Sequence, residues 1–216
     1  MASAASRGGR AVLVPADDDG AHAAAETLRR GGVVVVPTDT VYGLAARPDD
    51  RDAVQAVYRS KGRPDGMHLP VLAASVDQVR ALGVEMTAPA RALAGRWWPG
   101  PLTLAFGFVA GADRPGWLAD RDEVAVRIPD HDFLRGLLRQ TGPLLVTSAN
   151  AHGAPTPRAA GDVAAGLGRS VDLIVDGGLL TETPSTLVNV RGPVAAVERV
   201  GVITGDEVAR ALAVPS

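Results

Sequence analysis

The chain has 216 residues, of which 46% are hydrophobic and 21% are charged, and this composition excludes disorder for most of its length. Its formal charge of −2 gives no global positive field, so any contact with nucleic acid must be local. Because there is no cysteine, disulfide frameworks, thiolate metal sites and cysteine nucleophiles are excluded.

The length favours one domain, which we place at residues 11–216, after a flexible N-terminal tail at residues 1–10 of small, polar and basic residues. No apolar run is long enough for a signal sequence or a membrane span. These features predict a cytoplasmic protein without a membrane contact.

Taken in chain order, the apolar periodicity and the turn residues predict short helices and strands that alternate. Helices are predicted at residues 17–30, 50–60, 77–82, from 87 onward, 132–140, 159–167 and 204–212. Strands are predicted at 33–36, 69–73, 102–109, 124–128, 144–147, 172–175, 186–190 and 194–200, with 37–47 as a polar loop. The expected fold is α/β of the α+β type, a large twisted mixed open sheet of about seven strands with helices packed on it.

Lysine and asparagine are strongly avoided in this chain. Of the 22 basic residues, 21 are arginine and one is Lys61, and the asparagines are Asn150 and Asn189 alone. This bias is typical of GC-rich coding, in which arginine replaces lysine wherever any cation is sufficient. A retained lysine is therefore a candidate functional residue, although a solvated surface position is the alternative.

Several standard sites are missing from the sequence. No phosphate-binding G-x-x-x-x-G-K-[ST] or dinucleotide-binding G-x-G-x-x-G occurs, and the four histidines form no H-E-x-x-H pattern. We therefore expect no metal site built from protein side chains.

Polar clusters instead follow the predicted apolar strands, where loops of open sheets form ligand sites. Lys61 and Arg63 flank a glycine, so both cations can meet one phosphate group, unless the segment is a plain surface turn. Arg127 follows three apolar residues and needs an anionic partner, either a ligand or a carboxylate such as Asp39 or Asp130. Hydroxyl and amide groups elsewhere can orient a polar ligand, namely those of Thr38, Thr40, Ser148, Asn150 and Ser185.

Six motifs occur in a fixed order: PTDTVYGL, SKGRP, WPGPLT, VRIPDH, TSAN with Gly153 and Pro155, and PSTLV. Together they resemble the threonylcarbamoyl-AMP synthase family, also known as the YrdC/Sua5 family, over roughly residues 12–203. The resemblance implies a synthase that condenses L-threonine, bicarbonate and ATP, with Mg²⁺ accompanying ATP, to threonylcarbamoyl-AMP and pyrophosphate. It further implies that a tRNA threonylcarbamoyl transferase complex uses the product to modify adenosine 37 of tRNA, with at most a weak tRNA contact here.

The resemblance also assigns residues. It implies that ATP is bound, and the reaction catalysed, by a signature of Lys61, Arg63, Ser148 and Asn150, while Thr156 and Arg199 contact ATP and Thr40, Arg127 and Ser185 hold threonine. One departure concerns the family pattern K-G-R-P-x-x-N-P-L-x-x-H, whose histidine is Leu72 here. His68 stands four residues earlier, and whether it replaces that histidine is left open.

Two other functions are compatible with this fold. An RNA-binding module without synthase activity would bind through a positive concave surface, but the near-neutral charge and eight aromatic residues argue against an extended one. A carbamoyl-transfer domain like that of hydrogenase maturation proteins would bring additional zinc-finger segments, which a cysteine-free chain does not contain.

Overall fold

The computed structural model describes residues 10–62, 68–151, 153–181 and 183–213, so the tail predicted at 1–10 lies outside it except for Arg10. Its strands are β1 (Val12–Pro15), β2 (Val34–Val36), β3 (Gly43–Ala46), β4 (Val71–Leu72), β5 (Leu102–Phe106), β6 (Val124–Arg127), β7 (Leu144–Ser148), β8 (Leu173–Asp176), β9 (Thr186–Asn189) and β10 (Ala196–Arg199). The helices are α1 (Asp18–Arg29), α2 (Arg51–Lys61), α3 (Val76–Arg80), α4 (Ala88–Trp97), α5 (Asp132–Thr141), α6 (Ala160–Leu167) and α7 (Gly205–Leu212), with a 3-10 turn η1 (Gly116–Leu118).

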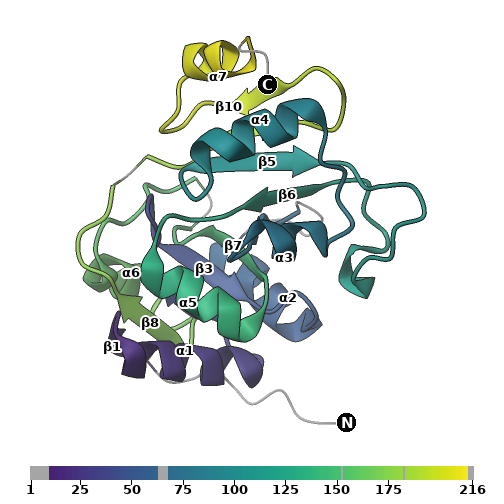
Figure 1. Cartoon of the computed structure of the whole chain (residues 1–216). Helices are drawn as coiled ribbons and strands as arrows, with labels where there is room; N and C mark the ends of the chain where they lie inside the picture. Colours follow the sequence, from purple (N-terminus) through teal and green to yellow (C-terminus); the bar gives the residue numbers. More distant parts are fainter. Residues whose placement is uncertain (1–9, 63–67, 152, 182, 214–216) are drawn as a thin grey trace.

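All these strands form one twisted sheet in the order β1-β8-β2-β3-β7-β4-β6-β5-β9-β10 (Figure 1). The pairs β1–β8, β2–β8, β4–β6 and β5–β9 are parallel, and the other neighbours are antiparallel. A mixed sheet with helices packed on it is therefore confirmed. The expected number of about seven strands is wrong, because the sheet has ten.

The strands missing from the prediction are β1 and β3. The Gly43–Ala46 strand was expected within a polar loop, but all its residues are buried between β2 and β7. It carries no alternation of polar and apolar residues because both of its faces are covered. Strand β1 pairs only with β8 at the sheet edge, which leaves Val12 and Leu13 more than half exposed.

Short polar side chains begin most of the helices as the sequence predicts. The Asp50 carboxylate accepts the Ala53 backbone N–H at the start of α2, and Thr204 forms a capping box with Glu207 at the start of α7. Helix α2 ends at Gly62, whose positive φ of 59° is the left-handed conformation that glycine adopts without strain. These caps place Lys61 in the last turn of α2.

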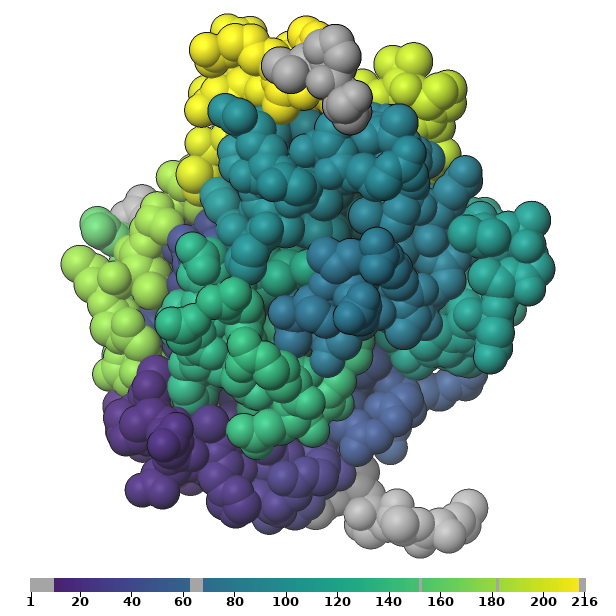
Figure 2. All heavy atoms as spheres, viewed as in Figure 1, coloured from purple at the N-terminus to yellow at the C-terminus, as the bar shows by residue number. Residues whose placement is uncertain are grey.

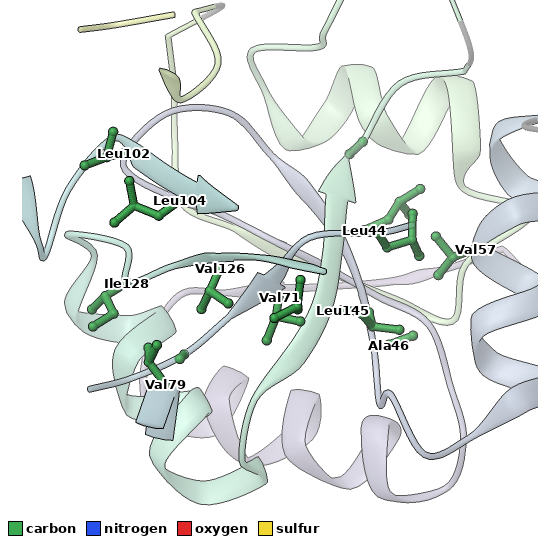
Figure 3. Close-up of a cluster of buried hydrophobic side chains, with 14 of the residues drawn as sticks. Leu44, Ala46, Val57, Val71, Val79, Leu102, Leu104, Val126, Ile128 and Leu145 are labelled. Carbon is green, nitrogen blue, oxygen red and sulfur yellow. The ribbon is translucent and has the colours of Figure 1, made fainter. Parts of the chain in front are cut away.

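One face of the sheet, which we term the cavity face, is covered at its β1 end by α1 and α5, which lie side by side (Figure 1). Leu28 of α1 and Leu134 and Leu138 of α5 pack there against sheet residues such as Val36 and Leu144. The opposite face is covered by α2, α3, α4, α6 and α7, and Figure 3 shows part of this larger core around Val57, Val71 and Val126.

Strict alternation along the strands separates the two faces. In β5, Leu102, Leu104 and Phe106 enter the larger core, whereas Thr103 and Ala105 point to the cavity face. Strand β6 follows the same pattern, because its valines are in the core while Arg127 and Ala125 line the cavity. The cavity face toward β10 is thus polar and carries the candidate site.

The molecule's C-terminal end lies beside that part of the sheet. Figures 1 and 2 show β10 and α7 in yellow at the top of the molecule and α1 in purple at the bottom. Helix α7 packs on α4, which in turn covers β5. Within the described ranges, no helix combines the length and the hydrophobicity needed to span a bilayer.

Candidate active site

A cavity of about 290 Å³ lies on the cavity face. Strands β5, β6, β9 and β10 line one side of it, and β4, β7 and the segment before β3 line the other. Its hydroxyl-bearing lining residues are Thr38, Thr40, Thr103, Thr147, Ser148 and Ser185, and its acidic and basic ones are Glu123, Arg127, Glu198 and Arg199. A concave polar site with two guanidinium groups suits a ligand that carries carboxylate or phosphate.

Arg127, the last residue of β6, is a charged residue of the cavity that is fixed by three side-chain hydrogen bonds. Its Nε donates to the Gly100 carbonyl at 3.0 Å, its Nη1 to Thr40 Oγ1 at 2.9 Å, and its Nη2 to Asp39 Oδ1 at 2.5 Å. Only 5% of the residue is exposed. The sequence left two aspartates as possible partners of Arg127, and the structure shows that the partner is Asp39. Asp130 instead pairs with Arg135 at 3.8 Å.

The Asp39 pair does not exhaust the Arg127 guanidinium. A guanidinium has five N–H groups, and Arg127 uses three of them toward described residues, so two on the terminal nitrogens can serve a ligand in the cavity. Burial lowers the pKa of Arg127, the positive charge of Arg199 lowers it as well, and the carboxylate of Asp39 opposes both effects. Arg127 can therefore anchor a ligand carboxylate while Asp39 compensates its charge in the absence of ligand.

The segment that bears Thr40 is folded over the sheet by its own hydrogen bonds. Thr38 Oγ1 donates to the Val41 carbonyl at 2.7 Å and accepts the backbone N–H of Thr40 at 3.0 Å. The hydroxyl groups of Thr38 and Thr40 lie 3.0 Å apart, and both residues are buried. This turn fixes the Thr40 hydroxyl beside Arg127, so the predicted pair is brought together.

Ser185 and Arg199 meet on the β9–β10 side of the cavity. Arg199 Nη2 donates to the Ser185 carbonyl at 2.8 Å, and Ser185 Oγ lies 2.8 Å from Thr103 Oγ1. Partial burial lowers the pKa of Arg199. Among the described residues Arg199 forms no ion pair with a carboxylate, so its charge is available to an anionic ligand.

Lys61 holds the loop that follows β7. Its Nζ donates to the carbonyl oxygens of Ser148 at 2.5 Å and Asn150 at 2.6 Å, with Ser148 Oγ at 3.4 Å and Asn150 Oδ1 at 3.2 Å. The Asn150 amide in turn donates to the carbonyls of Ala151 and Ala154. The structure therefore brings together Lys61, Ser148 and Asn150, whereas a contact of Lys61 with phosphate stays a prediction.

The remaining predicted nucleotide contacts are placed differently. Arg63 lies outside the described residues. Thr156 lies in the segment between β7 and α6 and is not among the residues that line the cavity. Ser148 lines the cavity, whereas Lys61 and Asn150 are not among its lining residues. Their roles toward ATP also stay predictions.

Several residues of the site were not predicted from the sequence. Thr103 was a strand residue of the WPGPLT motif, and only the strand alternation could have placed its hydroxyl on the polar face. Glu198 was not singled out at all. His68 and Leu72 both line the cavity, so His68 reaches the site from the segment before β4. Among the described residues, no hydrogen bond indicates what His68 does there.

The family described as "Telomere recombination" (Sua5_yciO_yrdC) matches residues 26–201. The chain belongs to the Sua5/YciO/YrdC family. A threonylcarbamoyl-AMP synthase of Bacillus subtilis is 37% identical over 187 residues, which are 86% of this chain and 54% of the relative. A putative threonylcarbamoyl-AMP synthase of Mycobacterium tuberculosis is 36% identical over 190 residues, which are 87% of this chain and 86% of the relative.

A solved structure of the Sua5/YciO/YrdC family has the same fold. The crystal structure of Pyrococcus abyssi Sua5 complexed with L-threonine matches with a TM-score of 0.84 and 32% identity, over 94% of this chain and 60% of that one. The chain thus spans about half the length of the Bacillus relative and three fifths of the Pyrococcus protein.

Proposed function

We propose that this protein is an L-threonylcarbamoyladenylate synthase, a nucleotidyltransferase that acts in the cytoplasm. The observation that carries the proposal is the cavity, which gathers Thr40, Arg127, Ser185 and Arg199 from four separate segments. These are positions that the family resemblance assigns to threonine and ATP. Relatives named threonylcarbamoyl-AMP synthase support the same activity.

The amino-acid end of the site is proposed around Arg127. Its two remaining N–H groups bind the threonine carboxylate, and the hydroxyl groups of Thr40 and Ser185 orient the other polar atoms. The neighbouring lining residues Leu72 and Ala125 are apolar and exclude water around the threonine methyl group. The Pyrococcus protein, which was crystallised as a complex with L-threonine, supports this substrate.

The nucleotide end is proposed around Arg199 and the loop after β7. Arg199 supplies positive charge to a phosphate, and Lys61 positions Ser148 by holding its carbonyl. Among the described residues no group of three or more histidines or carboxylates lies close enough to hold a metal ion. We propose that Mg²⁺ enters with ATP, where it neutralises phosphate charge.

The chemistry requires positioning and charge stabilisation. The α-ammonium group of threonine first loses a proton, and the amine and bicarbonate then give N-carboxy-threonine with loss of water. A carbamate oxygen attacks the α-phosphorus of ATP while pyrophosphate leaves. The product is a reactive mixed anhydride, so it must pass to an acceptor. We propose that this acceptor is a tRNA threonylcarbamoyl transferase complex that modifies adenosine 37, with only a weak tRNA contact on this chain.

Mass spectrometry tests the activity directly. Purified protein is incubated with Mg²⁺-ATP, L-threonine and ¹³C-bicarbonate, and we expect labelled threonylcarbamoyl-AMP together with pyrophosphate. Omission of bicarbonate must stop pyrophosphate release. Release that is indifferent to threonine and bicarbonate would contradict the proposal, and salt-sensitive RNA binding without any product would favour an RNA-binding module instead.

A further inference from the structure

A β-bulge turns two consecutive side chains of β10 toward the cavity. The register pairs Val197 with Val188 and Arg199 with Leu187, so one residue of β10, Glu198, has no partner in β9. In a regular strand Glu198 and Arg199 would face opposite sides of the sheet. Here both line the cavity, which is the effect that bulges have near ligand sites.

The Glu198 carboxylate is held in place by Asn189. Asn189 Nδ2 donates to Glu198 Oε1 at 2.7 Å, and Asn189 Oδ1 accepts the Arg191 backbone N–H at 3.1 Å, which fixes the orientation of the amide. Asn189 is one of only two asparagines in a chain that avoids this residue, and the other, Asn150, orders the loop after β7. Asn189 therefore contacts a residue that lines the cavity, and Asn150 belongs to the loop that follows the lining residue Ser148.

The charges of the cavity leave one carboxylate without a cation. Arg127 pairs with Asp39, and Glu123 pairs with Arg191 at 2.9 Å. Within the described ranges Glu198 forms no ion pair, and its hydrogen-bond partner, the Asn189 amide, is neutral. Glu198 therefore offers the cavity a carboxylate that can accept charged hydrogen bonds from a cationic group of a ligand.

We propose that Glu198 binds the α-ammonium group of the amino-acid substrate and that Asn189 positions it for that contact. The inference rests on the proposed function, in which Arg127 binds the substrate carboxylate. An α-amino acid at neutral pH carries one positive and one negative charge. Arg127 then binds the carboxylate and Glu198 binds the ammonium group, so both charges of the amino acid are matched. Arg199 binds the nucleotide.

Calorimetric titration of the full chain with two ligands tests this assignment. The ligands are L-threonine and 3-hydroxybutyrate, which is the same acid without the amino group. We expect Glu198→Gln to raise the Kd for threonine at least about tenfold, because one charged hydrogen bond is lost, and to leave the Kd for 3-hydroxybutyrate unchanged. Asn189→Ser, which keeps the carboxylate but removes its amide donor, should give a smaller loss that is also confined to threonine.

Glu123→Gln is the matched control, because Glu123 lines the same cavity but already has Arg191 as its partner. It should change the Kd for threonine less than about twofold. Glu198 is exposed on β10, so melting temperatures should show that Glu198→Gln folds as the parent protein does.

Three results with the variants would overturn the inference. An unchanged Kd for threonine in Glu198→Gln would exclude an ammonium contact and leave the proposed function intact. Equal losses for both ligands would show a general disturbance of the cavity, and a loss confined to ATP would assign Glu198 to the nucleotide. Failure of the parent protein to bind threonine would instead remove the proposed function together with this inference.

Discussion

Arg127 and Lys61 are the buried charged residues of the described core, each 5% exposed, and they are held in different ways. Arg127 joins three separate parts of the chain through Gly100, Thr40 and Asp39. Lys61 instead converges on oxygens of one short loop. A planar fork suits partners that are spread apart, whereas a compact ammonium suits oxygens that crowd around one point.

This comparison explains why one lysine persists among 21 arginines. The carbonyls of Ser148 and Asn150 both lie within 2.6 Å of Lys61 Nζ, a convergence that a guanidinium cannot reproduce. At Arg127 the reverse holds, because one ammonium cannot reach three separated acceptors. The composition therefore identified Lys61 as unusual, and the structure explains why a lysine is kept at this position.

The largest effect is expected at Arg127. In Arg127→Ala the Asp39 carboxylate stays buried without its partner, so the free energy of unfolding should fall by about 3–5 kcal/mol. Urea unfolding measures the loss. A double variant with Asp39→Leu and Arg127→Met should recover most of it, and a loss below about 1 kcal/mol in the single variant would show that the ion pair is not important for stability.

Lys61 gives the next effect. Lys61→Met leaves the carbonyls of Ser148 and Asn150 without their charged donor, and the free energy of unfolding should fall by about 1.5–3 kcal/mol. Lys61→Arg keeps the charge and is the matched control. Because a guanidinium does not fit the two carbonyls that meet at Lys61 Nζ, Lys61→Arg should still lower synthase turnover at least about tenfold, which corresponds to roughly 1.4 kcal/mol in the activation free energy. Unchanged turnover in Lys61→Arg would show that the ammonium is not required at this position.

His131 should make stability depend on pH. Its Nδ1 accepts the Leu134 backbone N–H at the start of α5, and burial lowers the pKa of His131 below its ordinary value of 6.5, although nearby aspartates oppose the shift. The neutral form is thus favoured in the fold, so stability is complete above pH 6.5 and falls as pH drops through the lowered pKa.

The size of this effect follows from the helix cap. Protonation removes the acceptor, so about 1 kcal/mol should be lost once His131 is protonated in the folded protein. His131→Asn retains a capping oxygen that does not titrate, and its thermal unfolding should vary less between about pH 7.5 and pH 5. Parallel pH curves for the two proteins would exclude this role.

The smallest effect on stability is expected at Arg199. It has no carboxylate partner within the described ranges, and partial burial lowers its pKa, so its charge is not stabilised in the free protein. Arg199→Leu should change the free energy of unfolding by less than about 0.5 kcal/mol, or raise it, while weakening ATP binding. Urea unfolding and calorimetry measure the two effects, and a large loss of stability would show that Arg199 is structural.

The sequence by itself determined the fold class, the positions of the helices with caps such as those of α2 and α7, and several polar residues that line the cavity. Thr204 and Asp50 mark helix starts through local hydrogen bonds, which depend only on neighbouring residues. Lys61 and Asn150 were recognisable because composition made them rare. The ordered motifs indicated Arg127, Thr40 and Ser185 without any knowledge of their contacts.

The tertiary structure decided whatever depends on partners distant in sequence. Strand β3 forms because β2 and β7 pair with it on both sides, and its four small and apolar residues carry no local signal of that pairing. Asp39 became the partner of Arg127 rather than Asp130 because the turn before β3 folds over β6. Glu198 reached the cavity through a bulge in β10, whose register exists only once β9 is in place.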